Sequence, residues 1–298
     1  MSEHRYAVAG LSELHSPSAK STPGAGCYLG VPAGRHAGPM TTPGQPSSLD
    51  TIRSTFPELD AWGGRGSKVN TGAPGSELEA DDAEYIAWQT SQLAAAGLMT
   101  ARNHLHAIRV HIEAGEQFGD VTGSLIRGAL LGSAQAVWIL APDDRATRLK
   151  RSRVVALEVC ENHRKFLADL LRINPNDKNT KTVHDHNVDR LEKLEEKREE
   201  LGETLTYSST SIIEQAAAHA IGKGFETEAR AEWRRFSGNA HGLPWALLGG
   251  AGTTQSAAAS GGLAPFTAGG SFDDVINGYA LVIRLVRHGW ELFDRRAA

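Results

Sequence analysis

The sequence predicts an all-α protein: a helical bundle of about seven to eight helices with a disordered N-terminal arm. After residue 75, apolar side chains recur at helical spacing in one segment after another, and no segment alternates in the way typical of a β-strand. The first 75 residues are rich in Gly, Pro, Ser and Thr and show neither period. We therefore divide the chain into an arm over 1–75 and a single helical domain over 76–298.

The arm contains stretches such as "HSPSAKSTPGAG" and "HAGPMTTPGQPSS". Their side chains cannot bury enough apolar surface to offset the conformational entropy lost on ordering, which predicts disorder. One segment of the arm, 49–62 ("LDTIRSTFPELDAW"), has enough apolar residues for a short helix or a docking segment. The arm is accordingly a candidate contact site for a protein partner.

Two helices are expected at the start of the domain. Ser76 and Glu79 have the spacing of a capping box, which predicts a helix of about five turns from Ser76. A second helix is expected from Met99, with apolar residues at helical spacing, until Gly119 and Asp120 interrupt the pattern.

The segment "SLIRGALLGSAQAVWIL" that follows is apolar around nearly its whole circumference. A helix of this kind is buried on every side, so we expect it to be central in the bundle. Leu130, Trp138 and Ile139 are predicted core residues. Arg127 lies in the same helix, and a buried guanidinium needs a carboxylate, several carbonyls or a solvent-filled cleft. Either it forms a structural ion pair, or it lines a cleft together with His241.

The rest of the chain continues the helical pattern. A long helix should begin after Pro142 and two aspartates, and a charged helix with three leucines on one side follows it. A further capping box runs from Ser211 to Glu214. We expect next a helix that carries "RRFSGNAH", a flexible small-residue loop over 249–270, and a long amphipathic helix that closes the chain.

Composition limits the cellular compartment and the classes of partner that we expect for this protein. The net charge is −4 with both signs mixed along the chain, so no general basic field attracts nucleic acid or a membrane surface. Cys27 and Cys160 lie in unlike surroundings, which disfavours a disulfide framework or a zinc cluster. No segment reaches the roughly 18 apolar residues of a membrane span, and the N-terminus lacks a leader pattern. We expect a cytoplasmic protein without membrane contact.

The stretch "RRFSGNAHGLPW" (234–245) is the leading candidate site. Arg234 and His241 are seven apart and share a helix face. A guanidinium that holds a phosphate beside an imidazole that moves a proton could cleave RNA without a metal ion, with the neighbouring 2′-hydroxyl as nucleophile. Arg234, Arg235 and His241 are the candidate catalytic residues. Ser237, Asn239 and Arg127 are candidates for orienting the substrate.

The same stretch has a structural interpretation. Gly242 after His241, with Pro244 two residues further, forms an ordinary helix stop. A histidine in the last helical turn is stabilised there by the helix dipole. The sequence leaves both interpretations open.

An arginine five or six residues before a histidine, near a helix end in an all-α bundle, resembles the signature of the HEPN superfamily. Both Arg234 and Arg235 satisfy this spacing. The resemblance implies a metal-independent ribonuclease of toxin–antitoxin or phage-defence type, whose site is assembled from two copies in a homodimer. The wider pattern "HLHAIRVHIEAG", "LIRGALLGSAQAVWILAP" and "WRRFSGNAHGLPWAL" is similar to helical proteins of actinobacteria and their phages. Those proteins often carry a glutamate where this chain has Leu131.

Histidines elsewhere in the chain do not complete a metal-binding pattern. His104 and His111 share a helix face, but no carboxylate-and-histidine motif accompanies them. The "HDH" at 184–186 begins a charged helix and fits a solvated surface. We therefore expect no metal site and no cofactor. Besides the ribonuclease, two functions stay open: a non-catalytic helical module that binds a protein through the arm or the closing helix, and a bundle that binds a small ligand.

Overall fold

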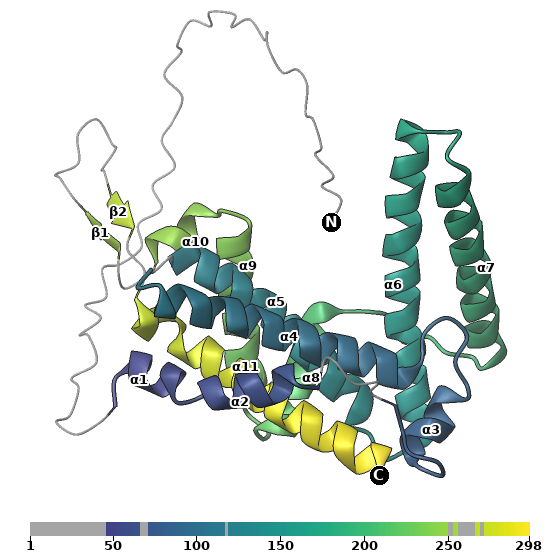
Figure 1. The fold of residues 1–298 in the computed structure, drawn as a ribbon, viewed down its shortest axis with the longest axis horizontal. Coiled ribbons are helices and arrows are strands. Elements are labelled where there is room, and N and C mark those ends of the chain that lie inside the picture. Colours follow the sequence, from purple (N-terminus) through teal and green to yellow (C-terminus); the bar gives the residue numbers. More distant parts are fainter. Residues whose placement is uncertain (1–45, 66–70, 117–118, 250–252, 256–265, 269–270) are drawn as a thin grey trace, which may run out of the picture.

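In the computed structural model, helices of very different lengths surround one central helix (Figure 1). The structure describes residues 46–65, 71–116, 119–249, 253–255, 266–268 and 271–298. The helices are α1 (Ser48–Arg53), α2 (Phe56–Gly63), α3 (Glu77–Asp82), α4 (Thr90–Glu113), α5 (Gly119–Leu140), α6 (Arg145–Ile173), α7 (Lys178–Glu200), α8 (Ser209–Ala220), α9 (Glu226–Ala240), α10 (Pro244–Leu248) and α11 (Phe272–Ala297).

The all-α class is confirmed. The segment expected as a flexible loop, 249–270, holds a pair of three-residue strands among its described residues, β1 (Thr253–Gln255) and β2 (Phe266–Ala268). They pair antiparallel, with Thr253 opposite Ala268. So small a ribbon has no sequence alternation to reveal it.

The folded body begins upstream of the expected boundary at Ser76. The helices α1 and α2 bury Ile52, Leu59 and Trp62 in the main core, and the Thr55 hydroxyl lies 2.8 Å from the Tyr279 hydroxyl on α11. The segment expected as a docking segment is thus docked on this same chain. The rest of the expected arm, 1–45 and 66–70, lies outside the described residues.

Several predicted helix starts differ from the structure; α7, for example, begins at Lys178, before the "HDH" at 184–186, and α5 begins at Gly119. Ser76 accepts a hydrogen bond from the Glu79 backbone N–H (3.2 Å), as expected, but α3 ends at Asp82 after six residues. The next helix, α4, begins at Thr90 and runs through the expected boundary at Met99. The Asp82 carboxylate ties the two helices by accepting from the Ser91 backbone N–H (2.9 Å) and hydroxyl (2.5 Å). This long-range cap is invisible to local periodicity.

Another mistaken start is that of α8. The N-cap is Ser208, whose hydroxyl oxygen accepts from the Ser211 backbone N–H (3.3 Å). The predicted capping box from Ser211 to Glu214 therefore lies inside the helix. Three consecutive hydroxyl residues precede Ser211, so the sequence offers several equivalent caps.

The central position of α5 is confirmed. Leu130, Trp138 and Ile139 are all buried, as predicted. The helix α4 crosses α5 closely at Gly97 and Gly132, where a Cβ on either residue would collide with the other's backbone carbonyl oxygen. Although α5 is long and apolar enough to cross a membrane, two thirds of its apolar window is buried inside the protein.

The closing helix α11 is also part of the core. Its amphipathic pattern is as expected, but its apolar face packs on α5 and α4, so it is not free for a partner. Gly119 of α5 and Ser271 before α11 line one cavity, whereas Arg296 at the far end of α11 donates to the Leu140 carbonyl of α5 (2.7 Å). The two helices therefore run parallel.

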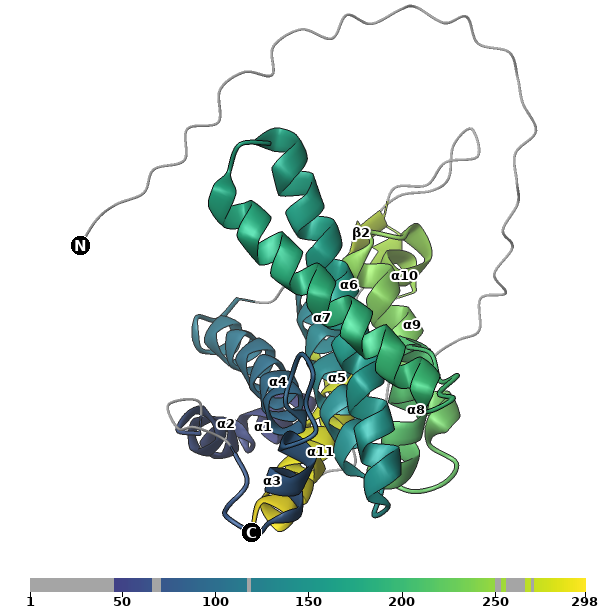
Figure 2. The ribbon, with the colours of Figure 1, turned by 90° about the vertical axis from the view of Figure 1, so that its right-hand side faces the viewer.

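The helices α6 and α7 form a hairpin that projects from the bundle (Figures 1 and 2). A small separate core near its base joins Cys160, Leu191 and Leu194 to the segment before α4. Two of the three leucines of the predicted stripe are buried there, and Leu201 is exposed. In Figure 1 the hairpin and α10 lie at opposite ends of the bundle.

Candidate functional site

The candidate motif forms the C-terminal end of α9 and the turn into α10. The backbone N–H of His241 donates to the Ser237 carbonyl (3.0 Å) and closes the last turn. Gly242 adopts the left-handed conformation (φ 63°), which a side chain would disfavour, and Pro244 starts α10. The backbone thus follows the helix-stop pattern, and the His241 side chain is exposed at the helix end.

A cavity of about 650 Å³, which we call the α9–α10 groove, opens beside this turn. Its walls come from α9, from α10 and from the first turns of α5 and α11. The lining residues are Gly119, Asp120, Ala231, Arg234, Arg235, Asn239, Trp245, Ala246, Leu247, Gly249, Ser271, Asp274 and Val275.

Arg234 is the cation available in this groove. It is exposed, and it makes no hydrogen bond or ion pair within the described part of the chain. Arg235 also lines the groove, but it pairs with Glu232 one turn earlier (2.5 Å) and its guanidinium lies over the Phe236 ring at 4.3 Å. The two arginines are neighbours in sequence and differ in what their charge is used for.

Asn239, which lines the groove, has an unsatisfied polar atom. Its side-chain oxygen is buried and has no hydrogen-bond partner among the described residues. Its amide nitrogen packs against Gly123 of α5, where a Cβ would approach it to 2.6 Å. A buried acceptor without a partner costs free energy, which a ligand or water in the groove could recover.

Arg127 and Ser237 lie together between α5 and α9, outside the lining of the groove. The Arg127 Nε donates to the Ser237 hydroxyl (3.1 Å), and the guanidinium lies 4.6 Å from the centre of the Trp233 ring. Among the described residues Arg127 makes no ion pair, so the structural ion pair considered from the sequence is not what holds it. A hydroxyl and an aromatic face take that role.

The structure therefore sorts the six candidate residues into three groups. Arg234, Arg235 and Asn239 line one groove; Arg127 and Ser237 bond to each other; and His241 is exposed but does not line the groove.

The groove is not uniformly basic. Asp120 in the first turn of α5 and Asp274 in the first turn of α11 also line it. The Asp120 carboxylate disfavours a polyanion near it. An anionic group would be favoured near Arg234 and disfavoured on the α5–α11 side.

Sequence reasoning missed Trp245. The indole lines the groove, and 55% of the residue is exposed. Its ring lies against Gly238 of α9, where a Cβ would come within 2.7 Å of it. The available signal was a tryptophan directly after the helix-starting Pro244, in a chain in which Trp138, Trp233 and Trp290 are buried.

Comparisons with known proteins give no lead. No family model, curated protein or solved structure matches this chain. The resemblance to HEPN proteins therefore stays a hypothesis.

Metal-ligating side chains do not gather anywhere in the described parts of the chain: no group of three histidines, cysteines or carboxylates could hold an ion. The closest pair of histidines was not anticipated. His219 Nδ1 of α8 and His288 Nε2 of α11 lie 2.8 Å apart.

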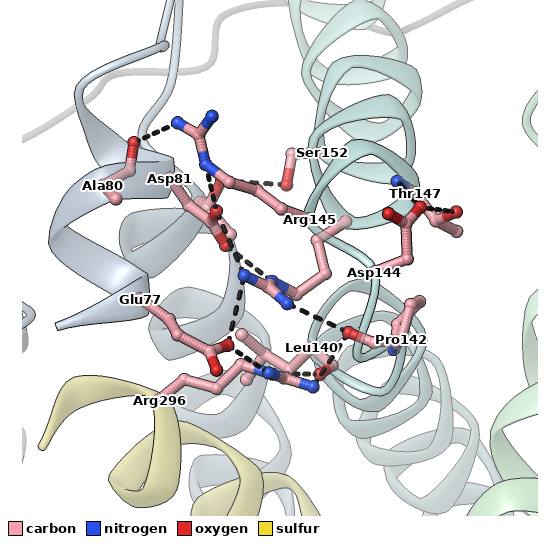
Figure 3. Close-up of polar contacts among 12 residues, drawn as sticks. Glu77, Ala80, Asp81, Leu140, Pro142, Asp144, Arg145, Thr147, Ser152 and Arg296 are labelled. Carbon is pink, nitrogen blue, oxygen red and sulfur yellow. Dashed lines mark hydrogen bonds and ion pairs between the residues drawn. The ribbon is translucent and has the colours of Figure 1, made fainter.

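A second polar cluster, shown in Figure 3, joins α3, α6 and the ends of α5 and α11. Arg148, only 2% exposed, binds the buried Asp81 carboxylate through Nε (2.7 Å) and the Asp143 carbonyl through Nη1 (2.9 Å). Arg296 pairs with Glu77 and donates to the last carbonyls of α5. The bonds of these buried arginines are directed at their own chain, which makes the cluster a structural junction.

Proposed function

We propose that this protein binds RNA at the α9–α10 groove and cleaves it without a metal ion, using Arg234 and His241. The observation that carries the proposal is the exposed Arg234 guanidinium, which lines a large cavity and has no partner in the described residues. A guanidinium with unused donors fits a phosphate well, because its planar fork matches two phosphate oxygens.

The chemistry is transesterification by the RNA itself. The 2′-hydroxyl oxygen attacks the adjacent phosphorus and loses its proton to a base, while the bond to the 5′-oxygen breaks and that oxygen takes a proton from an acid. The products are a 2′,3′-cyclic phosphate and a 5′-hydroxyl. Arg234 would stabilise the negative charge on the phosphoryl oxygens, and His241 would transfer protons near neutral pH.

Two copies of the chain would be needed. His241 of one chain is exposed at the helix end and does not line the groove that holds Arg234. A second copy packed across this end would bring its own His241 to the groove, where that one imidazole would take the proton of the 2′-hydroxyl and then give it to the departing 5′-oxygen. The exposed residues His241, Gly242 and Leu243 at the helix end are the expected contact.

The test is cleavage of a mixed RNA substrate in the presence of a chelator. Wild type should cut, while Arg234→Ala and His241→Ala should each lose at least about a hundredfold in rate, as is usual for positioned acid–base groups. His186→Ala, which removes an exposed histidine on the distant α7, is the matched control and should keep full activity.

Mixing the two inactive variants tests the shared site. In a mixed dimer, one groove can combine an intact arginine with the partner's intact histidine, so activity should return in part. If no activity returns although the subunits exchange, the site does not combine two copies. If wild type cuts no RNA at all, the ribonuclease proposal is wrong.

A second candidate is a protein-binding role for the α6–α7 hairpin. Phe166 and Ile173 near its tip are 58% and 81% exposed, although both are large and apolar. Such residues on a projecting element are typical of interaction surfaces. Pull-down with the full chain and with a Phe166→Ser, Ile173→Ser variant would test it, since only the native hairpin should retain a partner.

A further inference from the structure

Trp245 is an exposed groove residue to which neither the fold nor the proposed chemistry gives a role. Tryptophan buries more apolar surface than any other side chain when a protein can cover it, and it is enriched where partners bind. Here more than half of the residue faces solvent, beside Arg234 and Asn239.

The Trp245 indole is held in place by its packing against the backbone of α9. Gly238 of α9 is buried, and atoms Cζ2 and Cη2 of Trp245 would lie 2.7 and 3.0 Å from a Cβ on that residue. Only a glycine lets the ring approach the helix backbone so closely. The Leu243 backbone N–H donates to the Gly238 carbonyl (2.9 Å), which fixes the turn that carries α10 and its indole.

An aromatic surface beside a free guanidinium matches the alternation of base and phosphate in a nucleic-acid strand. Base–aromatic stacking tolerates any sequence because every base has a flat π-face. It requires a base that is not already stacked in a helix, so such a site favours single strands over duplexes.

An acidic residue of the groove limits how many phosphates the groove can bind. Asp120 in the first turn of α5 disfavours a further phosphate near it, and Arg234 is the cation available in the groove, so the charge pattern favours a single phosphate at Arg234.

We propose that Trp245 is a stacking platform for one unpaired base of single-stranded RNA, adjacent to the phosphate that Arg234 holds. This inference rests on the proposed function and names the form of RNA that the same groove accepts. It makes Trp245 a binding residue that selects single strands and leaves the choice of base open.

The experiment measures binding separately from cleavage. A fluorescent eight-nucleotide 2′-O-methyl RNA, which lacks the nucleophilic hydroxyl, is titrated with the unaltered full-length protein and followed by anisotropy. The same strand with abasic sugars should bind about tenfold or more weakly, because one stacked base is lost. An eight-base-pair duplex should bind as weakly as the abasic strand.

Variants assign the effect to the residue. Trp245→Ala should weaken binding of the normal strand about tenfold and leave binding of the abasic strand unchanged, whereas Trp245→Phe should retain most of the affinity. Tyr85→Ala, which removes an exposed aromatic on the segment before α4, is the control and should bind like wild type. Arg234→Ala should weaken binding of both strands.

The outcomes separate the two proposals. If Arg234→Ala loses binding while Trp245→Ala and the abasic strand match wild type, the platform is wrong and RNA binding stands. If bases and Trp245 contribute as described but natural RNA is not cleaved, the platform stands and the ribonuclease is wrong. If no single strand binds, both are wrong.

Discussion

Arg148 and Arg234 lie on helices of the same bundle and use the same chemical group in opposite ways. Arg148 is almost fully buried, and its N–H groups donate hydrogen bonds to the Asp81 carboxylate and to the carbonyls of Pro142 and Asp143. Arg234 is exposed on the wall of a cavity and has no partner in the described residues.

The difference distinguishes a charged side chain that stabilises the fold from one that is available to bind a ligand. A guanidinium carries five N–H donors, and a buried one must satisfy them within the protein. Arg148 does so, and the bonds it makes join α3 to α6. Nothing in the fold requires Arg234, so its position at a groove is better explained by what the groove binds. Substitutions that separate stability from binding can test this contrast.

Of the substitutions that test this comparison, the one at the buried Arg148 should lower stability most. Arg148→Met removes the buried partner of Asp81, which is 1% exposed and keeps only the half-exposed Arg145 at 3.2 Å, and should lower the free energy of unfolding by about 3–5 kcal/mol. Urea unfolding of the full chain measures it. Arg234→Met is the matched control and should change stability by no more than about 0.5 kcal/mol. Equal effects of the two substitutions would remove the basis of the comparison.

A substitution in the apolar core gives a reference for the loss of stability caused by Arg148→Met. Leu130→Ala in the centre of α5 should cost about 2–5 kcal/mol, since the side chain is fully buried and its loss leaves a cavity. The same unfolding experiment applies. A cost below about 0.5 kcal/mol would mean that α5 is peripheral.

A single methyl group added beneath the Trp245 indole should lower the stability of the protein. Gly238→Ala would place a Cβ 2.7 Å from the Trp245 ring and from the Ala246 side chain, so α10 must shift at a cost of about 1–3 kcal/mol. Gly64→Ala is the control, because its Cβ would meet only the Ala61 carbonyl at 3.5 Å. If Gly238→Ala is as harmless as the control, the indole is not held against α9.

The smallest effect concerns pH and the pair His219 and His288. Burial, then the charge of His288, lowers the pKa of His219 below its usual 6.5; Arg295 and Arg151 act in the same direction, and Asp143 opposes them. The unfolded chain thus binds the proton more readily. The contribution of His219 to stability is complete above about pH 6.5 and is lost as pH falls through the folded-state pKa.

Thermal unfolding between pH 5 and 8 checks this expectation. Replacing His219 with Gln should flatten the decline in melting temperature below pH 6.5, whereas His186→Gln on the exposed face of α7 should not. If His219→Gln melts with the same pH dependence as wild type, the pair does not contribute.

Much of the bundle is predictable because its helices carry their own periodicity. The apolar circumference of α5 places Leu130 and Trp138 in the core without further information. The break between α3 and α4 is not predictable locally, because it depends on a bond from Ser91 to Asp82. The helices α1 and α2 lie where the sequence allows a short helix, but their packing against the main core through Ile52, Leu59 and Trp62 depends on the fold.

The candidate site divides in the same way. Arg235 and Asn239 are four residues apart on α9, so their spacing alone brings them to one side of the helix, whereas Arg234 is turned about 100° from Arg235. Trp245 and the first turns of α5 and α11 reach the groove only through the fold. The bond between Arg127 and Ser237 spans 110 residues, and no pattern along the chain anticipates it.

The most direct test of the central claim is to measure unfolding and RNA cleavage on the same preparation of Arg234→Ala. The account predicts a melting temperature within a few degrees of wild type, together with loss of cleavage in the presence of a chelator. A variant that stays fully active, or one that is inactive only because it no longer folds, would show that Arg234 is not the group that binds phosphate.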